Sequence, residues 1–328
     1  NKQNGTADAV RSAKAYLSFK EDDLCLVLYG DSPLLEVKTL RRLIENIKKN
    51  KSHLSLLTMR PEDPKSYGRI ILDNKKNIQK IIEYSETNNE EKKIELCNSG
   101  IMIIKSSILE SYIHKIENKN KKNEFYLTDI VEILVKSGKK VSFDVCDYSE
   151  TLGVNDRKDL LIVENEYQKK MRNQFLNKGV TLIDPKSNYF SFDTIIGKDS
   201  IIQPNVYFGI NVVVGENVII KSFTHLEGVK ISKNCEVGPF ARIRPESVLE
   251  KNVKIGNFVE IKKSIIKNDT NVSHLSYIGD ATIGHKTNIG AGSITCNYDG
   301  IRKNKTTIGD NCFIGSNTSL IAPLSIGD

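Results

Sequence analysis

Residues 195–220 read IIGKDSIIQPNVYFGINVVVGENVII, and the spacing of their apolar residues decides the fold of the second half of the chain. An apolar residue returns every six positions, at Ile196, Ile202, Phe208, Val214 and Ile220. An α-helix has 3.6 residues per turn and a half-buried strand alternates every two residues, so neither produces this period. A six-residue period predicts a parallel β-helix, in which each hexapeptide forms one flat side and three hexapeptides close a triangular coil.

The same period continues along the rest of the chain in further runs, with single-residue slips between some of them. These runs are Ile231, Val237, Ile243, Leu249, Ile255 and Ile261; Ile266, Val272 and Ile278; Ile283 and Ile289; and Ile308, Ile314, Leu320 and Ile326. Turn residues between them are expected to be small or to tolerate a positive φ. The period breaks at 296–305, CNYDGIRKNK, which predicts a loop that leaves the coil and carries function.

The first half of the chain has a different sequence pattern, in which β-rich and helical segments alternate. LCLVLYGD (24–31), LLEVKTLRRLIENIKKN (34–50) and SHLSLLTMR (52–60) follow one another, and this order predicts an α/β sheet domain. The apolar run 24–29 predicts a strand buried on both faces. Because open α/β sheets bind ligands beyond the carboxyl ends of their strands, Asp31 lies where a ligand or a metal is expected.

Further strands are predicted in 66–73 and 96–105, and a helix in 125–138 that begins at Thr128 or Asp129 and ends at Gly138. The segment 156–178 is charged, lacks Gly and Pro and has a helical period. We therefore expect three parts: an α/β domain at 1–155, a helical linker arm at 156–178 and a β-helix domain at 179–328.

Composition excludes several classes of protein. The net charge of +7 comes from 48 basic and 41 acidic residues spread along the chain, without the clustering that a nucleic-acid-binding protein shows. The six cysteines form no CxxC pair, which argues against a zinc site or a disulfide framework. The opening NKQNGTADAV has no apolar signal core, and no apolar run approaches a membrane span. A soluble cytoplasmic protein without nucleic-acid or membrane partners is expected.

Twelve short motifs then occur in order along nearly the whole chain. They are NGTADA, LYGDSPL, YGRI, the Glu of IIEYSE, CNSGI, FYLTDI, GVNDR, GPFARIRP, GNFVEIKKS, SHLSYIGDA, NIGAGSITCNYDG and FIGSN. The set resembles the bifunctional N-acetylglucosamine-1-phosphate uridyltransferase and glucosamine-1-phosphate acetyltransferase family. This resemblance implies a Rossmann-like α/β nucleotidyltransferase domain and a β-helix that is left-handed. It also implies synthesis of UDP-N-acetylglucosamine for peptidoglycan and lipopolysaccharide precursors.

For the first domain the resemblance implies uridylyl transfer from UTP to N-acetylglucosamine-1-phosphate, with release of pyrophosphate. Asp31 and Asn155 match the residues that hold Mg²⁺, and Gly5 and Thr6 match positions beside the uracil. The positions matching UDP-N-acetylglucosamine contacts are Gly5, Thr6, Tyr29, Gly30, Asp31, Gly68, Glu83, Asn98 and Asn155. Position alone also allows Asp31 to be a helix cap, and Gly5 and Gly68 to be turn residues.

For the second domain the resemblance implies acetyl transfer from acetyl-CoA to glucosamine-1-phosphate in a homotrimer whose sites lie between neighbouring chains. His274 matches the general base, and an imidazole titrates near the working pH. The remaining matches are Arg244 and Lys262 for the phosphate, Tyr277 and Asn288 for the sugar, and Ala291, Asn297, Tyr298 and Ser316 for acetyl-CoA.

The chain also departs from the family pattern. The family begins with a strand and a glycine-rich loop bearing basic residues that wrap the triphosphate, and this chain begins after that segment and stops within a repeat. We therefore expect a fragment with negligible uridylyltransferase activity and weakened acetyl-CoA binding.

Two alternatives stay open at this point. A pyrophosphorylase for another nucleotide sugar would have no need of SHLSYIGDA and NYDG, and a non-catalytic assembly or regulatory subunit would have no need of His274, Asp31 and Asn155.

Overall fold

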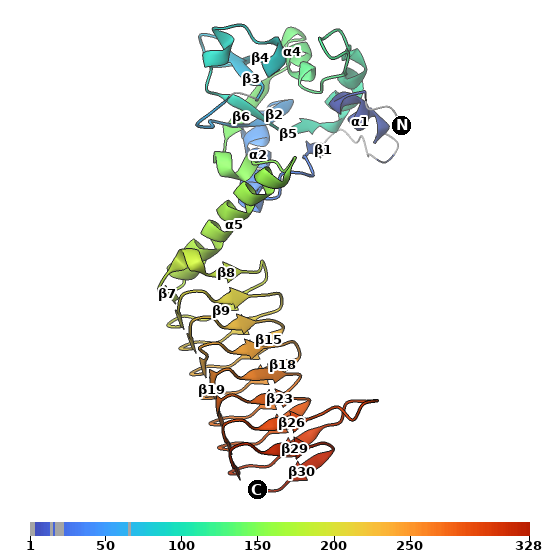
Figure 1. The fold of residues 1–328 in the computed structure, drawn as a ribbon. Helices are drawn as coiled ribbons and strands as arrows, with labels where there is room; N and C mark the ends of the chain where they lie inside the picture. The colour runs from blue at the N-terminus through green and yellow to red at the C-terminus, as the bar shows by residue number, and fades with distance from the viewer. Residues whose placement is uncertain (1–3, 14–15, 17–22, 65–66) are drawn as a thin grey trace. The chain divides into compact units, whose positions relative to one another are not determined.

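The computed structural model describes residues 4–13, 16, 23–64 and 67–328, and the chain divides into two compact units, 1–164 and 165–328 (Figure 1). The helix α5 (Arg157–Asn177) covers almost all of the predicted arm, and the division between the units falls within it. Among the described residues, none of the helices combines the length and the apolar character that a bilayer crossing requires.

The first unit is built around one sheet. Its strands are β1 (Leu24–Val27), β2 (Leu54–Met59), β3 (Arg69–Leu72), β4 (Ile78–Ile82), β5 (Cys97–Lys105) and β6 (Val141–Val145). The sheet order is β4-β3-β5-β2-β6, and β1 pairs with the carboxyl-terminal half of β5. Strand β5 runs antiparallel to β1, β2 and β3, whereas β2 and β6 are parallel.

Helices pack against this sheet over two apolar clusters. The helices are α1 (Thr6–Ser12), α2 (Val37–Lys49), α3 (Ser106–Tyr112) and α4 (Asp129–Lys136). Leu43 and Ile47 of α2 pack with Leu57 and Met59 of β2. Leu54, Leu56, Met102 and Ile104 instead join the cluster that contains Ile130 and Leu134 of α4. Side chains of β2 and β5 therefore divide between two cores, as expected for strands covered on both faces.

The expectation that 24–29 is buried on both faces was wrong. Strand β1 ends at Val27, its four residues are only partly buried, and Leu28 and Tyr29 are 45% and 38% exposed. In the part of the chain that the structure describes, β1 pairs with β5 alone. The doubly covered strand is β2, in which all six residues are buried. An apolar run indicates a strand, but it shows neither how many neighbours the strand has nor how deeply the strand is buried.

The second unit is a parallel β-helix of three eight-stranded sheets. The first sheet contains β7 (Thr181–Leu182), β10 (Ile201–Ile202), β13 (Ile219–Ile220), β16 (Glu236–Val237), β19 (Lys254–Asn257), β22 (Asn271–His274), β25 (Asn288–Ile289) and β28 (Phe313–Ile314). The second contains β8 (Tyr189–Phe190), β11 (Tyr207–Phe208), β14 (His225–Leu226), β17 (Arg242–Ile243), β20 (Glu260–Lys262), β23 (Tyr277–Gly279), β26 (Ile294–Cys296) and β29 (Ser319–Ile321). The third contains β9 (Ile195–Ile196), β12 (Val213–Val214), β15 (Val229–Ile231), β18 (Ser247–Leu249), β21 (Ile265–Ile266), β24 (Ala281–Ile283), β27 (Thr306–Ile308) and β30 (Leu324–Ile326).

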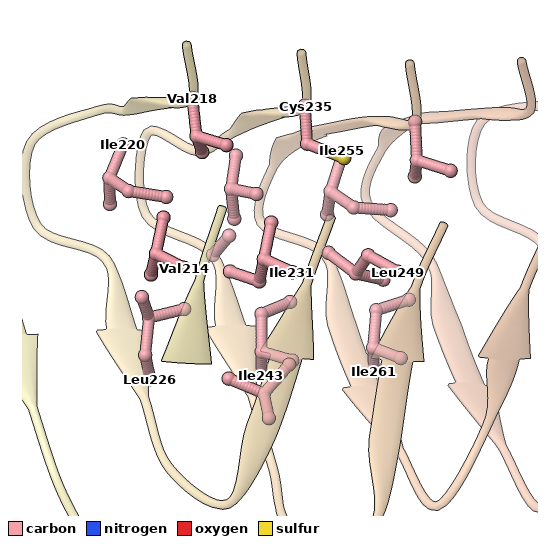
Figure 2. Packing of buried hydrophobic residues seen from close by; sticks show 14 of the residues in the cluster. Val214, Val218, Ile220, Leu226, Ile231, Cys235, Ile243, Leu249, Ile255 and Ile261 are labelled. Atoms are coloured by element: carbon pink, nitrogen blue, oxygen red, sulfur yellow. The ribbon is translucent and has the colours of Figure 1, made fainter. Parts of the chain in front are cut away.

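The predicted period is confirmed, because its apolar residues fill the interior of the coil (Figure 2). Ile219 pairs with Ile201 in one neighbouring coil and with Glu236 in the other, so adjacent coils are 18 and 17 residues apart. The shorter coil arises where the step from Leu226 to Ile231 is five residues instead of six. Eight coils of this kind agree with the left-handed β-helix of the family resemblance. Burying one Ile side chain completely stabilises the fold by about 1.5–3 kcal/mol relative to leaving it exposed.

The residue types at the corners of the coil match the predicted turn residues at most positions, with some exceptions. Asn and Asp occupy many corners with positive φ, as at Asn205, Asn211 and Asn217. The prediction of small or tolerant turn residues was wrong at several corners, among them Phe223, Phe240 and Phe258, which have φ of 59°, 54° and 54°. Their rings stack with centroid separations of 4.9 and 5.3 Å and are about half exposed. We call these three residues the phenylalanine column.

Two candidate active sites

The first site begins where Tyr29 covers Gly100. Gly100 has a φ of 83°, and a Cβ built there would lie 1.8 Å from Cε2 of Tyr29, so only glycine admits the ring in this position. Burial, followed by the charges of Glu83 and Asp31, raises the pKa of Tyr29. The ring of Tyr29 therefore lies near both predicted carboxylates.

A chain of contacts joins the predicted sugar-binding positions. The backbone N–H of Asn98 donates to the carbonyl of Gly68 at 2.8 Å, and Oδ1 of Asn98 accepts from the N–H of Gly100 at 3.1 Å. A Cβ at Gly68 would lie 3.2 Å from Ile81 and 3.5 Å from Oε2 of Glu83. The structure thus brings Tyr29, Gly68, Glu83 and Asn98 together around the amino-terminal end of β5.

The predicted uracil positions lie against the FYLTDI segment. The N–H of Leu127 donates to Oγ1 of Thr6 at 2.9 Å. Gly5 has a φ of 111°, and a Cβ there would lie 2.6 Å from the carbonyl oxygen of Phe125. The next residue, Thr128, donates from its hydroxyl to Oε1 of Glu83 at 2.8 Å. The segment 125–128 therefore links Gly5 and Thr6 to the predicted sugar-binding carboxylate.

A short backbone link holds Val154, the residue before Asn155, against Asp31. The N–H of Val154 donates to the carbonyl of Asp31 at 2.9 Å, and a Cβ at Gly153 would lie 3.5 Å from Oδ2 of Asp31. The two side chains offer carboxylate and amide oxygens, the ligand types that Mg²⁺ prefers. No cluster of three His, Cys, Asp or Glu residues suited to a metal occurs in the described ranges. The donor set fits an ion held by few protein ligands.

Sequence reasoning named Asp129 only as a possible first residue of the helix, and α4 does begin there. Burial, followed by the charges of Glu83, Glu132 and Glu86, raises the pKa of Asp129 to about 6. The carboxyl group of Asp129 therefore takes up a proton at a higher pH than an ordinary aspartic acid does.

The second site contains three cations on one side of the β-helix. The N–H of Arg244 donates to the carbonyl of Ile261, which places Arg244 and Lys262 on successive coils. Nη1 of Arg244 donates to Oε1 of Glu260 at 2.8 Å. A hydrogen bond with Lys262, together with its charge, lowers the pKa of Lys303. We call Arg244, Lys262 and Lys303 the cation cluster.

Lys303 was missed from the sequence, although the loop 296–305 that carries it was singled out. The signal was present in the basic run RKNK at the end of that loop. An isolated bridge between Tyr298 and Lys303 folds the loop back on itself, and Tyr298 donates to the carbonyl of Gly300 at 2.7 Å. The loop thus returns its lysine to the face that carries Lys262.

Tyr277 and Asn297 lie beside this cluster. The side-chain amide of Asn297 donates to Oδ2 of Asp280 and, at 3.5 Å, to the hydroxyl of Tyr277. Asn297 and Asp280 are only 7% and 8% exposed. The structure therefore holds Asn297 as a buried link between Tyr277 and Asp280.

The remaining predicted residues occupy neighbouring coils. His274 is exposed at the end of β22, and Asn288 pairs with Asn271 of that strand. The N–H of Gly292, which follows Ala291, donates to the carbonyl of His274 at 3.2 Å. Ser316 is exposed one coil further on, where the N–H of Asn317 donates to the carbonyl of Ala291 at 2.7 Å. Ala291 therefore lies between the coils of His274 and Ser316.

Comparison with known proteins agrees with this arrangement of units. A model of the nucleotidyl transferase family matches residues 1–149, and a model of the GMPPB C-terminal domain matches residues 226–321. The bifunctional protein GlmU of Zymomonas mobilis subsp. mobilis is 46% identical over 326 residues, which cover 99% of this chain and 72% of that protein. The proteins of the same name from Jannaschia sp. and Paramagnetospirillum magneticum are 42% and 43% identical, with 99% of this chain and 71% and 72% of theirs covered. The chain therefore belongs to the GlmU family of bifunctional proteins.

Proposed function

We propose that the two reactions of this bifunctional enzyme of UDP-N-acetylglucosamine synthesis are divided between its two units. The β-helix acetylates glucosamine-1-phosphate, and the α/β unit carries the uridylyltransferase site that joins the product to UMP. The observation that carries the proposal is the grouping of His274, Tyr277 and the cation cluster on adjoining coils. A base, a polar sugar contact and phosphate-binding cations are what acetylation of an amino-sugar phosphate requires.

In the acetyl transfer, the cation cluster binds the phosphate of glucosamine-1-phosphate, and the fork of Arg244 suits two of its oxygens. His274 takes a proton from the amine as its nitrogen attacks the thioester carbonyl of acetyl-CoA and forms the C–N bond. The tetrahedral intermediate then breaks the C–S bond, and the imidazolium returns the proton to the thiolate of CoA. N-acetylglucosamine-1-phosphate and CoA leave.

In the first unit, Asp31 and Asn155 would hold a Mg²⁺ ion, which neutralises phosphate charge when bound. Glu83 and Asn98 bind the sugar, Tyr29 lies against Gly100 beside them, and Gly5 and Thr6 lie beside the base. These residues align the sugar phosphate with the α-phosphorus of UTP, and alignment is the main source of rate in phosphoryl transfer.

We also propose a homotrimer that works in the cytoplasm. The phenylalanine column supports self-association, because stacked and half-exposed aromatic rings mark interaction surfaces. The left-handed backbone costs a bulky residue about 1–2 kcal/mol at each corner, so the column is retained at a cost to the isolated chain. All six cysteines are free, which suits a reducing compartment.

The test is consumption of acetyl-CoA in the presence of glucosamine-1-phosphate by this chain and by its His274→Ala variant. We expect the variant to lose about 10²- to 10⁴-fold in kcat, the usual contribution of a general base. Equal rates in the two proteins would reject His274 as the base. Glucose-1-phosphate, which has no amine, serves as the control substrate and is expected to remain unmodified.

A further inference from the structure

The imidazole of His274, the general base of the proposed acetyl transfer, has a single polar side-chain partner in the described β-helix contacts. Oδ1 of Asn257 lies 2.6 Å from Nδ1 of His274. Asn257 ends β19 and His274 ends β22, and the two residues are paired in the parallel register of these strands. The pair therefore joins equivalent positions of two successive coils.

The two strands are extended at this point. β19 and β22 contain four residues each, whereas every other strand of the β-helix, which is described throughout, contains two or three. The extra length adds the pairing of Asn257 with His274 beyond that of Ile255 with Val272. Gly256 permits the close approach, because a Cβ there would lie 1.9 Å from the carbonyl oxygen of Ser273. The local fold thus brings the amide and the imidazole together.

The backbone around His274 is also fixed from both neighbouring coils. The N–H of Leu275 donates to the carbonyl of Asn257 at 3.1 Å, on one side. The N–H of Gly292 donates to the carbonyl of His274 at 3.2 Å, on the other. The hydroxyl of Ser276 donates to the same carbonyl at 2.8 Å. The imidazole therefore has a fixed backbone, and Asn257 sets the orientation of its ring.

We infer that Asn257 is the positioning residue for His274, an inference that rests on the proposed acetyltransferase function. The oxygen of an amide only accepts hydrogen bonds, so Nδ1 of His274 must carry the proton. Nε2 then has a free lone pair and accepts the amine proton as the C–N bond forms. A neutral amide fixes this tautomer without the added charge that a carboxylate would bring.

The experiment compares the Asn257→Ala, Asn257→Asp and His274→Ala variants in the acetyl-CoA assay with glucosamine-1-phosphate. We expect Asn257→Ala to lower kcat about three- to tenfold, the value of one neutral hydrogen bond, with KM for the sugar phosphate unchanged. Asn257→Asp restores the acceptor and adds a charge that favours the imidazolium. It should recover most of kcat at high pH and move the acidic limb of the pH–rate profile upward by about one unit.

The matched control is Asn252→Gly. Asn252 accepts from Asn234 and donates to Asp269 on the same β-helix, and its φ of 61° suits glycine. Its loss should leave kcat and the pH–rate profile unchanged. If His274→Ala loses activity while both Asn257 variants keep the wild-type kcat and pH–rate profile, the positioning role of Asn257 is overturned and His274 remains the base. Retention of activity in His274→Ala would instead overturn the proposed base.

Discussion

The hydroxyl of Thr128 donates a 2.8 Å hydrogen bond to Oε1 of Glu83, although Thr128 occupies the position that caps α4. Its side chain makes no capping bond to the helix, and Thr128 is 6% exposed. The residue thus holds the predicted sugar-binding carboxylate in one orientation.

Replacement of Thr128 by Val should weaken binding of UDP-N-acetylglucosamine about tenfold. Val keeps the shape of the side chain but removes the donor to Glu83, and a hydrogen bond to a charged group contributes about 1.5–3 kcal/mol. Isothermal titration calorimetry measures the effect. Thr128→Ser retains the hydroxyl and should bind like the parent. Equal affinity of the Val and Ser variants would show that Thr128 has no part in orienting Glu83.

Asp129 should make the stability of the first unit depend on pH. Burial and the neighbouring glutamates raise its pKa in the folded chain to about 6, above the usual 3.8. The carboxyl therefore stabilises the fold when protonated, below about pH 4, and this stabilisation is lost as the pH rises through 6.

Asp129→Asn remains neutral at every pH. After allowance for its partial exposure, we expect the variant to be more stable than the parent by about 1 kcal/mol at pH 8, and equally stable near pH 4. Urea denaturation followed by circular dichroism at 222 nm reports mainly on the helices of the first unit. A constant difference between the two proteins across this range would contradict the assignment.

Lys303 should make the affinity for the sugar phosphate fall at alkaline pH. Contact with Lys262 lowers its pKa, so Lys303 loses its charge at a lower pH than an ordinary lysine does. Lys303→Met should raise KM for glucosamine-1-phosphate about fivefold at pH 7.5 with little change in kcat. Lys303→Arg stays charged and should hold its KM to higher pH than the parent. Identical pH dependence of KM in the parent and the Arg variant would exclude Lys303 from phosphate binding.

The phenylalanine column should control association more than folding. Phe240→Asn places at the corner a residue that tolerates positive φ, and it removes the central ring of the stack. We expect analytical ultracentrifugation to show a shift from trimer towards monomer, with the circular dichroism of the β-helix preserved. Phe313→Asn removes an exposed ring outside the column and is expected to leave the association state unchanged. A Phe240→Asn protein that associates as the parent does would refute the role of the column.

The fold of the second unit was largely predictable because its signal is local. Each hexapeptide contributes an inward residue, so the repeated apolar positions from Ile196 onward report the coil directly. The step from Leu226 to Ile231 appeared only as a slip of period, and the structure shows it to be a shortened coil. The burial of β1 was not predictable in the same way, because it depends on the number of partners that the sheet provides.

The candidate sites were predictable as lists of residues but not as networks. Family motifs named Glu83 and Lys262, yet they did not indicate that Thr128 contacts the first or that Lys303 contacts the second. Asn257 lies within GNFVEIKKS and 17 positions before His274, the length of a shortened coil. That spacing indicated that the two residues could be neighbours on successive coils, but only the register of the coils shows that they are in contact.

The coil length also bears on how the protein is made. Each strand of the β-helix pairs with strands only 17 to 25 residues away in the sequence, as Ile289 does with Val272 and Ile314. A coil leaving the ribosome therefore needs nothing but the coil before it as a template, and the unit can grow in the direction of translation. Synthesis and folding of this half of the chain can therefore proceed in the same order, because each new coil pairs with the coil formed just before it.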